Sequence, residues 1–214
     1  MAKEKLILIG GGGHARSCID VIESEGRFEI AGIVEKDKRS TENIPGYPVI
    51  GSDDDLPDIA KIYTNFFVSI GQIGRAQNRI KVYERLKQLN VKLVTIVSPT
   101  AYVTETVKLG EGTIIMHHAV INTKANIGYN TIVNTGAIIE HDVSIGNHCH
   151  ISTGTIVNGE CRIGNDVFIG SGSVLRETVS VCDNVILGLG SLAIRSVEEE
   201  GTYVGQPIRK LTHA

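Results

Sequence analysis

A six-residue period runs through the second half of the chain. From Val97 onward every sixth residue is Ile, Leu or Val, and only the last member, Ala193, is smaller. Four residues after each of these stands a small or β-branched residue, as at Thr131 and Cys149. A fixed period of this kind is typical of a solenoid of parallel β coils, with both series pointing inward and the residues between them forming corners. Residues 97–197 number 101; at three hexapeptides a coil they predict between five and six coils, with no long projecting loop.

The first half of the chain shows no such period. Instead, strands alternate with helices, which is typical of a small parallel sheet. We expect strands at 5–10, 29–35, 64–71 and 92–97, helices at 14–26 and 75–90, and irregular connections around residues 45–51. The expected organisation is therefore an α/β domain of Rossmann-like type over residues 1–97. A β-helix domain with a C-terminal tail follows over residues 98–214.

Charge and composition exclude several classes of protein. The net charge is −3 with both signs mixed along the chain, whereas a nucleic-acid-binding protein should carry a basic stripe. The apolar run at residues 6–10 is too short for a signal peptide or a membrane span, so we expect a cytoplasmic protein. The four cysteines show no C-x-x-C spacing and are expected to be reduced. Cys149 and Cys161 fall on the inward series and are expected to be packing residues.

A glycine-rich segment, residues 10–15, fits the pattern G-x-G-x-x-A between a strand and a helix. Such a segment lets a phosphate approach backbone amides and a helix N-terminus. The second strand ends in Glu35, where a ribose-binding acid is expected. One alternative is a glycine turn that only allows close packing. Another is a nicotinamide-dependent dehydrogenase, but the domain is short and no site for hydride transfer is evident. A mononucleotide or a nucleotide-sugar fits better.

Three of the seven histidines, His141, His148 and His150, lie within ten residues of the repeat. In the hexapeptide register all three are expected outside the prism, so a histidine satisfied within a core is not expected. His141 is either a general base in a groove between neighbouring prisms, a zinc ligand, or an exposed residue without a role. Zinc needs about three converging ligands. His141 and His150 are nine residues apart and lack an obvious third ligand.

Several segments together resemble a known family. They are LIGGGGHAR, FVSIGQIGRAQNR, VINTKANIGYNTIVNTGAIIEHD, HCHISTGTIVNGECRIG and GTYVGQPIRKL. The chain resembles the hexapeptide-repeat sugar acyltransferases of the sialic-acid and bacillosamine type, and most closely the UDP-4-amino-sugar N-acetyltransferases. The resemblance implies a left-handed parallel β-helix, whereas general connection rules favour right-handed crossovers. It also implies a homotrimer with active sites between subunits.

The resemblance also implies roles for particular residues. His141 is the general base, Asp142 orients it, and His150 lies near the thioester of acetyl-CoA. The implied sugar-nucleotide contacts are Gly13, His14, Glu35, Asp37, Gly71, Gln72, Arg75 and Asn134. The expected acetyl-CoA contacts are His150, Gly159, Gly170, Gly188, Arg209 and Lys210, of which the last two would meet phosphates. No metal is expected.

The chemistry agrees with these roles. An amine that attacks a thioester must lose a proton, and imidazole is suited to accept it. The oxyanion needs a donor, either a backbone amide such as that of Gly159 or the His150 side chain. No activated Ser or Cys is evident, so direct transfer is expected. The prediction is an acetyl-CoA-dependent N-acetyltransferase acting on a UDP-activated 4-amino-4,6-dideoxy sugar. The alternatives are an O-acetyltransferase of sialic acid or a related sugar, a zinc enzyme on the same helix, and a binding protein for a nucleotide-sugar.

Overall fold

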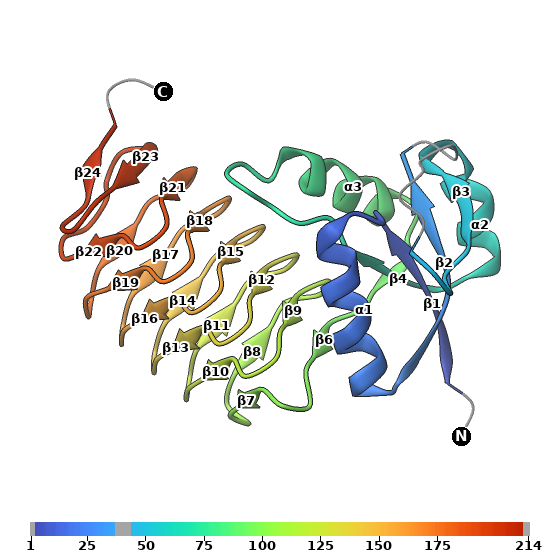
Figure 1. The fold of residues 1–214 in the computed structure, drawn as a ribbon, viewed down its shortest axis with the longest axis horizontal. Coiled ribbons are helices and arrows are strands. Elements are labelled where there is room, and N and C mark those ends of the chain that lie inside the picture. Colours follow the sequence, from blue (N-terminus) through green and yellow to red (C-terminus); the bar gives the residue numbers. More distant parts are fainter. Residues whose placement is uncertain (1–2, 37–43, 212–214) are drawn as a thin grey trace. The chain divides into compact units, whose positions relative to one another are not determined.

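The computed structural model describes residues 3–36 and 44–211. The described chain divides into two compact units (Figure 1). The first contains the residues up to Gly71 together with Gln77–Val97, and the second contains Gln72–Ala76 together with the residues from Ser98 onward. Within the described residues, no helix is both long and apolar enough to cross a bilayer.

The first unit is built on a parallel sheet with strand order β3-β2-β1-β4-β5. The structure differs from the expectation at three places. Strand β3 lies in the region around 45–51, where only irregular chain was expected, α2 forms where no element was expected, and the strand expected at 92–97 is split into β5 and β6. The elements are β1 (Glu4–Ile9), α1 (Gly13–Glu25), β2 (Phe28–Glu35), β3 (Val49–Ser52), a 3₁₀ turn (Asp53–Asp55), α2 (Leu56–Ile62), β4 (Asn65–Val68), α3 (Gln77–Gln88), β5 (Lys92–Leu93) and β6 (Ile96–Val97).

The core of this unit centres on β1, whose residues 6–9 are at most 1% exposed. Helix α1 buries Ala15, Cys18 and Ile22 on one face, as its spacing predicts. The helix ends at Gly26, whose left-handed backbone (φ 78°) lets its amide bond back to the Ile22 carbonyl. A glycine at this position stops the helix at little cost, because it has no Cβ to clash.

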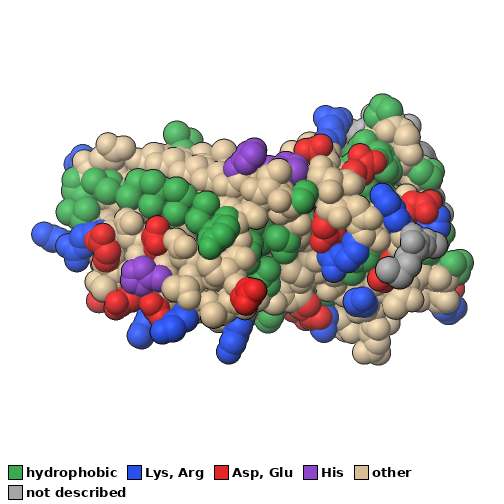
Figure 2. All heavy atoms as spheres, turned by 90° about the horizontal axis from the view of Figure 1, so that it is seen from below, with side chains coloured by type: hydrophobic (Ala, Val, Ile, Leu, Met, Phe, Trp, Pro, Cys, Tyr) green, Lys and Arg blue, Asp and Glu red, His purple; other side chains and the backbone are tan. Residues whose placement is uncertain are grey.

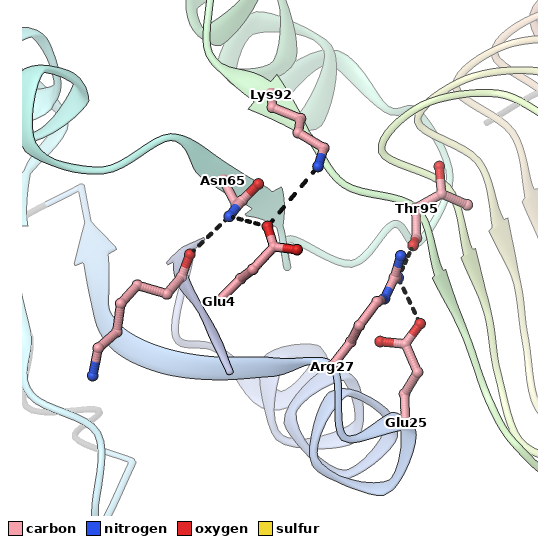
Figure 3. Close-up of polar contacts among 7 residues, drawn as sticks. Glu4, Glu25, Arg27, Asn65, Lys92 and Thr95 are labelled. Carbon is pink, nitrogen blue, oxygen red and sulfur yellow. Dashed lines mark hydrogen bonds and ion pairs between the residues drawn. The ribbon is translucent and has the colours of Figure 1, made fainter. Parts of the chain in front are cut away.

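Polar contacts fasten the strand ends of this unit (Figure 3). The Asn65 amide at the start of β4 donates to Glu4 and to the carbonyl of Lys5, both at 3.1 Å. Arg27 follows α1 and donates to Glu25 at 2.6 Å and to the carbonyl of Thr95 at 2.7 Å. These contacts tie the start of β1 and the chain after α1 to later segments of the same unit.

The second unit is a three-sided stack of short parallel strands (Figure 1). The first face contains β7 (Tyr102–Val103), β10 (Val120–Ile121), β13 (Ile138–Ile139), β16 (Ile156–Val157), β19 (Val174–Leu175) and β22 (Leu192–Ala193). The second face contains β8 (Lys108–Leu109), β11 (Asn126–Ile127), β14 (Ser144–Ile145), β17 (Arg162–Ile163) and β20 (Ser180–Val181). The third face begins with β6 and continues with β9 (Ile114–Ile115), β12 (Ile132–Val133), β15 (His150–Ile151), β18 (Phe168–Ile169), β21 (Val185–Leu187), β23 (Gly201–Val204) and the antiparallel β24 (Arg209–Lys210).

Both inward series are buried, as the six-residue period predicts. From Thr113 to Val197 no member of either series is more than 4% exposed. The polar members bond along the stack: the Thr113 hydroxyl donates to the Gly128 carbonyl at 2.7 Å and the Cys149 thiol to the Gly164 carbonyl at 3.0 Å. Most of these hydroxyls and thiols fit this core because their acceptor lies in the neighbouring coil, whereas the Ser191 hydroxyl donates to Gly188 within its own coil. The prediction that Cys149 and Cys161 are packing residues agrees with their complete burial.

Candidate active site

The corner between β13 and β14 carries an exposed His-Asp pair. The Nδ1 atom of His141 lies 2.9 Å from the Oδ2 atom of Asp142, and the two side chains are 53% and 44% exposed. A carboxylate accepts but does not donate, so the proton of the imidazole sits on Nδ1 and Nε2 keeps its lone pair. Asp142 has a left-handed backbone (φ 58°), a conformation that Asp tolerates better than most residues. This corner therefore presents an oriented imidazole.

The buried backbone of Gly159, one coil further along, lies directly against the His141 ring. A Cβ atom added to Gly159 would lie 2.8 Å from both Cε1 and Nε2 of the imidazole. Such a contact is too short, so only glycine lets the ring keep this position. The two residues expected to supply the base and an oxyanion donor are thus neighbours in the structure.

Three further side chains at this corner were not expected from the sequence. The Asn122 amide donates to Glu140 Oε2 at 2.9 Å, and the Asn158 amide donates to the Leu175 carbonyl at 2.7 Å. All three residues are half-buried. The coil period could have identified them, because residues 122, 140 and 158 are 18 apart and therefore occupy the same position in successive coils. They form a polar column beside His141.

His148 and His150 lie outside the two inward series, as their register predicts, but both are buried. His148 is 8% exposed, its Nδ1 lies 2.8 Å from the Asn130 amide, and its ring meets Tyr129 edge-on at 5.0 Å. His150 is 6% exposed. Both side chains leave the prism outward but are covered by neighbouring residues, which a repeat register cannot reveal.

Two residues expected to touch the substrate, Gln72 and Asn134, contact His150. Its Nδ1 atom lies 2.9 Å from the carbonyl oxygen of Gln72, and its Nε2 atom lies 3.0 Å from the Asn134 amide nitrogen. Phe168 packs edge-on against the ring at 5.4 Å. Gln72 is itself 4% exposed, whereas Arg75 is exposed. Of these expected site residues, Gln72 is buried, Asn134 is half-buried and Arg75 is exposed.

The glycine-rich loop of the first unit is closed by Glu35. The amide of Gly11 donates to the Glu35 carboxylate, so the end of β2 and the loop after β1 are joined. Gly10 has a left-handed backbone (φ 95°), which favours glycine. Gly13 opens α1, and an added Cβ there meets nothing within 4 Å. The loop thus keeps an open approach at Gly13. Asp37 lies outside the described residues.

His14, in the first turn of α1, lies against Gly71 and near a buried arginine. A Cβ added to Gly71 would lie 2.9 Å from the His14 Cβ. Arg79 of α3 is 1% exposed, a burial that the helical pattern of the sequence did not predict. Burial, and secondarily the Arg79 charge, lower the pKa of His14 from 6.5 to about 4. His14 is therefore neutral at physiological pH.

This lowered pKa predicts a pH-dependent stability. Above the unfolded-state pKa of 6.5 His14 is neutral in both states, so its protonation does not reduce the free energy of unfolding. As the pH falls from 6.5 toward 4 the unfolded chain binds a proton that the folded chain does not, so stability is lost. We expect the free energy of unfolding to fall by up to about 3 kcal/mol more in the wild type than in His14→Asn over this window. Denaturant titrations of both proteins at several pH values measure this, and parallel curves would contradict it.

The residues expected to contact acetyl-CoA include glycines in closely stacked coils and basic residues exposed to solvent. A Cβ on Gly170 would lie 2.5 Å from the Leu189 nitrogen, and one on Gly188 would lie 2.7 Å from Val204 Cγ1. Close stacking of coils therefore accounts for both glycines. Arg209 and Lys210 are exposed on β24, and Lys210 pairs with Glu199 at 2.7 Å.

The zinc alternative requires converging ligands. Among residues 3–36 and 44–211, no group of three or more His, Cys, Asp or Glu side chains is placed to hold a metal ion. Asp142 is engaged by His141, and His150 is held by an amide and a carbonyl. The histidines thus do not form a metal centre in the described part of the chain.

Comparisons with known proteins cover both units. The family described as the PglD N-terminal domain matches residues 5–86. The acetyltransferase domain of PglB from Neisseria gonorrhoeae FA1090 is 28% identical, with a TM-score of 0.88 over 98% of this chain and 100% of that one. PerB from Caulobacter crescentus, solved with CoA and GDP-perosamine, is 30% identical, with a TM-score of 0.90 over 98% of each chain. The chain belongs to the hexapeptide-repeat sugar acyltransferases.

The family and the fold class predicted from the sequence are thereby confirmed. This acyltransferase consists of an α/β unit and a left-handed parallel β-helix. A further sequence relative, the uncharacterized protein L142 of Acanthamoeba polyphaga mimivirus, is 32% identical over 115 residues. That match takes in 52% of this chain but spans only 21% of the relative's length.

Proposed function

We propose that this acyltransferase is an acetyl-CoA-dependent N-acetyltransferase that acts on the amino group of a UDP-activated 4-amino-4,6-dideoxy sugar. The observation that carries the proposal is the exposed His141 ring, oriented by Asp142 at 2.9 Å and resting on Gly159. The similar proteins support it: PerB was solved with CoA and GDP-perosamine, and the PglB domain with acetyl coenzyme A.

The proposed reaction is a direct transfer. Nε2 of His141 accepts a proton from the sugar amine as the amine nitrogen bonds to the thioester carbon. The carbon–sulfur bond then breaks, and the proton held by His141 passes to the departing thiolate, so no net proton is gained or lost by the enzyme. Asp142 keeps the second imidazole nitrogen protonated and stabilises the transient imidazolium. We assign the backbone amide of Gly159 to the developing oxyanion, because this glycine adjoins the imidazole.

We place the nucleotide at the glycine-rich loop. The open space at Gly13, the N-terminus of α1 and the Glu35 carboxylate at the end of β2 support this placement. Asp37 remains a proposed contact. His14 is a candidate for a neutral hydrogen-bonding contact, because its lowered pKa removes its charge.

Replacement of Gly13 by valine is expected to weaken sugar-nucleotide binding by at least tenfold while acetyl-CoA binding stays unchanged. The added side chain meets no protein atom within 4 Å at its Cβ, so it fills the space for the phosphate and leaves the loop intact. Calorimetric titration with each substrate measures the two affinities. Equal loss of both affinities would contradict the placement of the nucleotide. Gly13→Ala, with its smaller side chain, should give an intermediate effect.

We further propose that three copies assemble through the first face of the β-helix. Figure 2 shows a band of hydrophobic side chains along the β-helix. The outward residues of the first face are all apolar or aromatic, namely Tyr102, Val120, Ile138, Ile156, Val174 and Leu192. Those of the second face are polar and exposed, namely Lys108, Asn126, Ser144, Arg162 and Ser180. An apolar face of this length favours association with a second apolar surface.

The His141 corner adjoins this first face, because β13 ends at Ile139. In the proposed trimer the corner therefore borders the interface, and a neighbouring copy completes the groove for acetyl-CoA. Gly170, Gly188 and Arg209 remain proposed contacts for it. Arg209 is a better candidate than Lys210 for the phosphates, since Lys210 is paired with Glu199.

The function is tested by incubation with acetyl-CoA and a panel of acceptors. The panel contains UDP- and GDP-linked 4-amino sugars, their 4-hydroxy counterparts, and sialic acid. We expect CoA release only with an amino sugar, fastest with the UDP form, and mass spectrometry should locate the acetyl group on nitrogen. Transfer to a hydroxyl, or binding without CoA release, would contradict it.

A further inference from the structure

The segment Gln72–Ala76, called the strap below, leaves β4 and returns to α3 but belongs to the compact unit of the β-helix. It is fastened at both ends. The Gln72 carbonyl lies 2.9 Å from His150 Nδ1, and the Ala76 amide donates to Asp166 Oδ1 at 3.0 Å. Gln72 and Ala76 are at most 4% exposed, whereas Ile73 between them is 97% exposed. The strap therefore has two buried anchors and an exposed middle.

The strap is also braced from within. The side-chain amide of Gln72 donates to the carbonyl of Gly74 at 2.7 Å. Gly74 has a left-handed backbone (φ 84°), and a Cβ there would lie 3.6 Å from Ile186. This turn directs the exposed residues Ile73 and Arg75 away from the buried anchors.

The hydrogen bonds of His150 define its tautomer. A backbone carbonyl only accepts, so Nδ1 of His150 carries the proton that is donated to Gln72. On the other side, Asn134 Oδ1 accepts from the Thr135 amide at 2.7 Å, which leaves the Asn134 NH₂ group facing Nε2. Nε2 is thus an acceptor. In this arrangement neutral His150 has no proton left to donate to a thioester oxygen.

From this geometry we infer that His150 and Asp166 are positioning residues, which fasten the strap to the β-helix and hold Arg75 exposed for an anionic substrate. The guanidinium of Arg75 suits the diphosphate of a sugar nucleotide. This role replaces direct assistance to the thioester by His150. The kinetic part of the inference rests on the proposed function, whereas the anchoring of the strap does not.

The variants His150→Asn and His150→Ala separate the two roles. Asn places an amide donor near the position of Nδ1 and keeps the bond to Gln72, but it has no group in the place of Nε2. His150→Ala removes both. If His150 positions the strap, His150→Asn keeps the strap anchored and His150→Ala releases it. If Nε2 acts on the thioester, both variants lose kcat equally.

Asp166 provides a matched pair on the second anchor. Asp166→Asn keeps the oxygen that accepts from Ala76, and Asn tolerates the left-handed backbone of this residue (φ 51°). Asp166→Ala removes the acceptor. We expect Asp166→Ala to loosen the strap as much as His150→Ala does, and both Asn variants to hold it as the wild type does.

Anchoring is read out without substrate by limited trypsin digestion. Arg75 is exposed, and cleavage after it requires the strap to leave its anchors. We expect cleavage at this bond, identified by mass spectrometry, to be roughly three- to tenfold faster in His150→Ala and Asp166→Ala, the size that loss of one hydrogen bond produces. Unchanged cleavage rates in both alanine variants would overturn the inference even if the enzyme has a different activity.

Kinetics then test the consequence for the substrate. For the alanine variants we expect KM for the sugar nucleotide to rise roughly three- to tenfold with kcat nearly unchanged, and Arg75→Ala to raise KM in the same way without altering the anchors. A fall in kcat at constant KM that is shared by His150→Ala and His150→Asn would overturn the positioning role. Should His150→Ala fail to fold, the Asp166 pair alone still decides the question.

Discussion

His141→Ala is expected to lower kcat by about 10²–10⁴-fold, the range that a positioned general base contributes. The side chain is 53% exposed and contacts Asp142 and Gly159. Its removal takes away the proton acceptor but no buried apolar surface. The melting temperature and the oligomeric state should therefore stay close to those of the wild type. Steady-state kinetics at saturating concentrations of both substrates measure the loss.

A comparison with Asp142→Asn makes this result specific to proton transfer. Asp142→Asn keeps a residue that tolerates the left-handed backbone but no longer fixes the proton on Nδ1, so an intermediate loss is expected. Retention of most of the activity by His141→Ala would refute the assignment of the base.

Ile156→Glu is expected to break the assembly and to abolish most of the activity. Ile156 is the outward residue of β16, near the middle of the apolar first face. Burial of a carboxylate without a partner against a second apolar surface costs several kcal/mol. This cost is larger than the free energy that one apolar contact contributes to the assembly. Sedimentation should change from about three times 23.1 kDa for the wild type to 23.1 kDa for the variant. Activity should fall with it, since the His141 corner borders the proposed interface.

Ser144→Glu provides the control on another face. Ser144 is the exposed outward residue of β14 on the polar second face, and it tolerates a charge in water. This variant should stay assembled and folded. An Ile156→Glu protein that remains trimeric would show that the first face is not the interface. A stable, fully active wild-type monomer would refute the shared site altogether.

The β-helix was predictable because its determinant is local and repeated. Each coil buries the same two positions, so the sequence period reports directly which residues, such as Ile145 and Cys149, lie inside. The α/β unit was predicted less completely. Strand β3 has four residues and pairs only with β2 at the sheet edge, and Pro48 and Gly51 mask it. Short edge strands carry little periodic signal.

The site was predictable to the extent that it follows the coil register. His141 and Asp142 occupy the exposed corner that the register assigns to them, and Gly159 lies one coil on. The environment of His150 was not predictable, because Gln72 lies 78 positions earlier in the chain. The burial of Arg79 likewise depends on how α3 packs, whereas the helical pattern had favoured its apolar neighbours.

The stacking of the β-helix limits which insertions and deletions the chain can accept. Backbone bonds from Ile132 to Cys149 and from His150 to Val167 repeat with the same geometry one coil apart. Removal or duplication of 18 consecutive residues within the stack therefore restores every inward position on its own face. A change of 6 or 12 residues keeps the inward positions but moves the following strands to another face, and a change that is not a multiple of six exchanges inside for outside. This acyltransferase should accept length only in whole coils. An extra coil placed after Ile169 would lengthen the β-helix while the coil that bears His141 keeps its immediate neighbours.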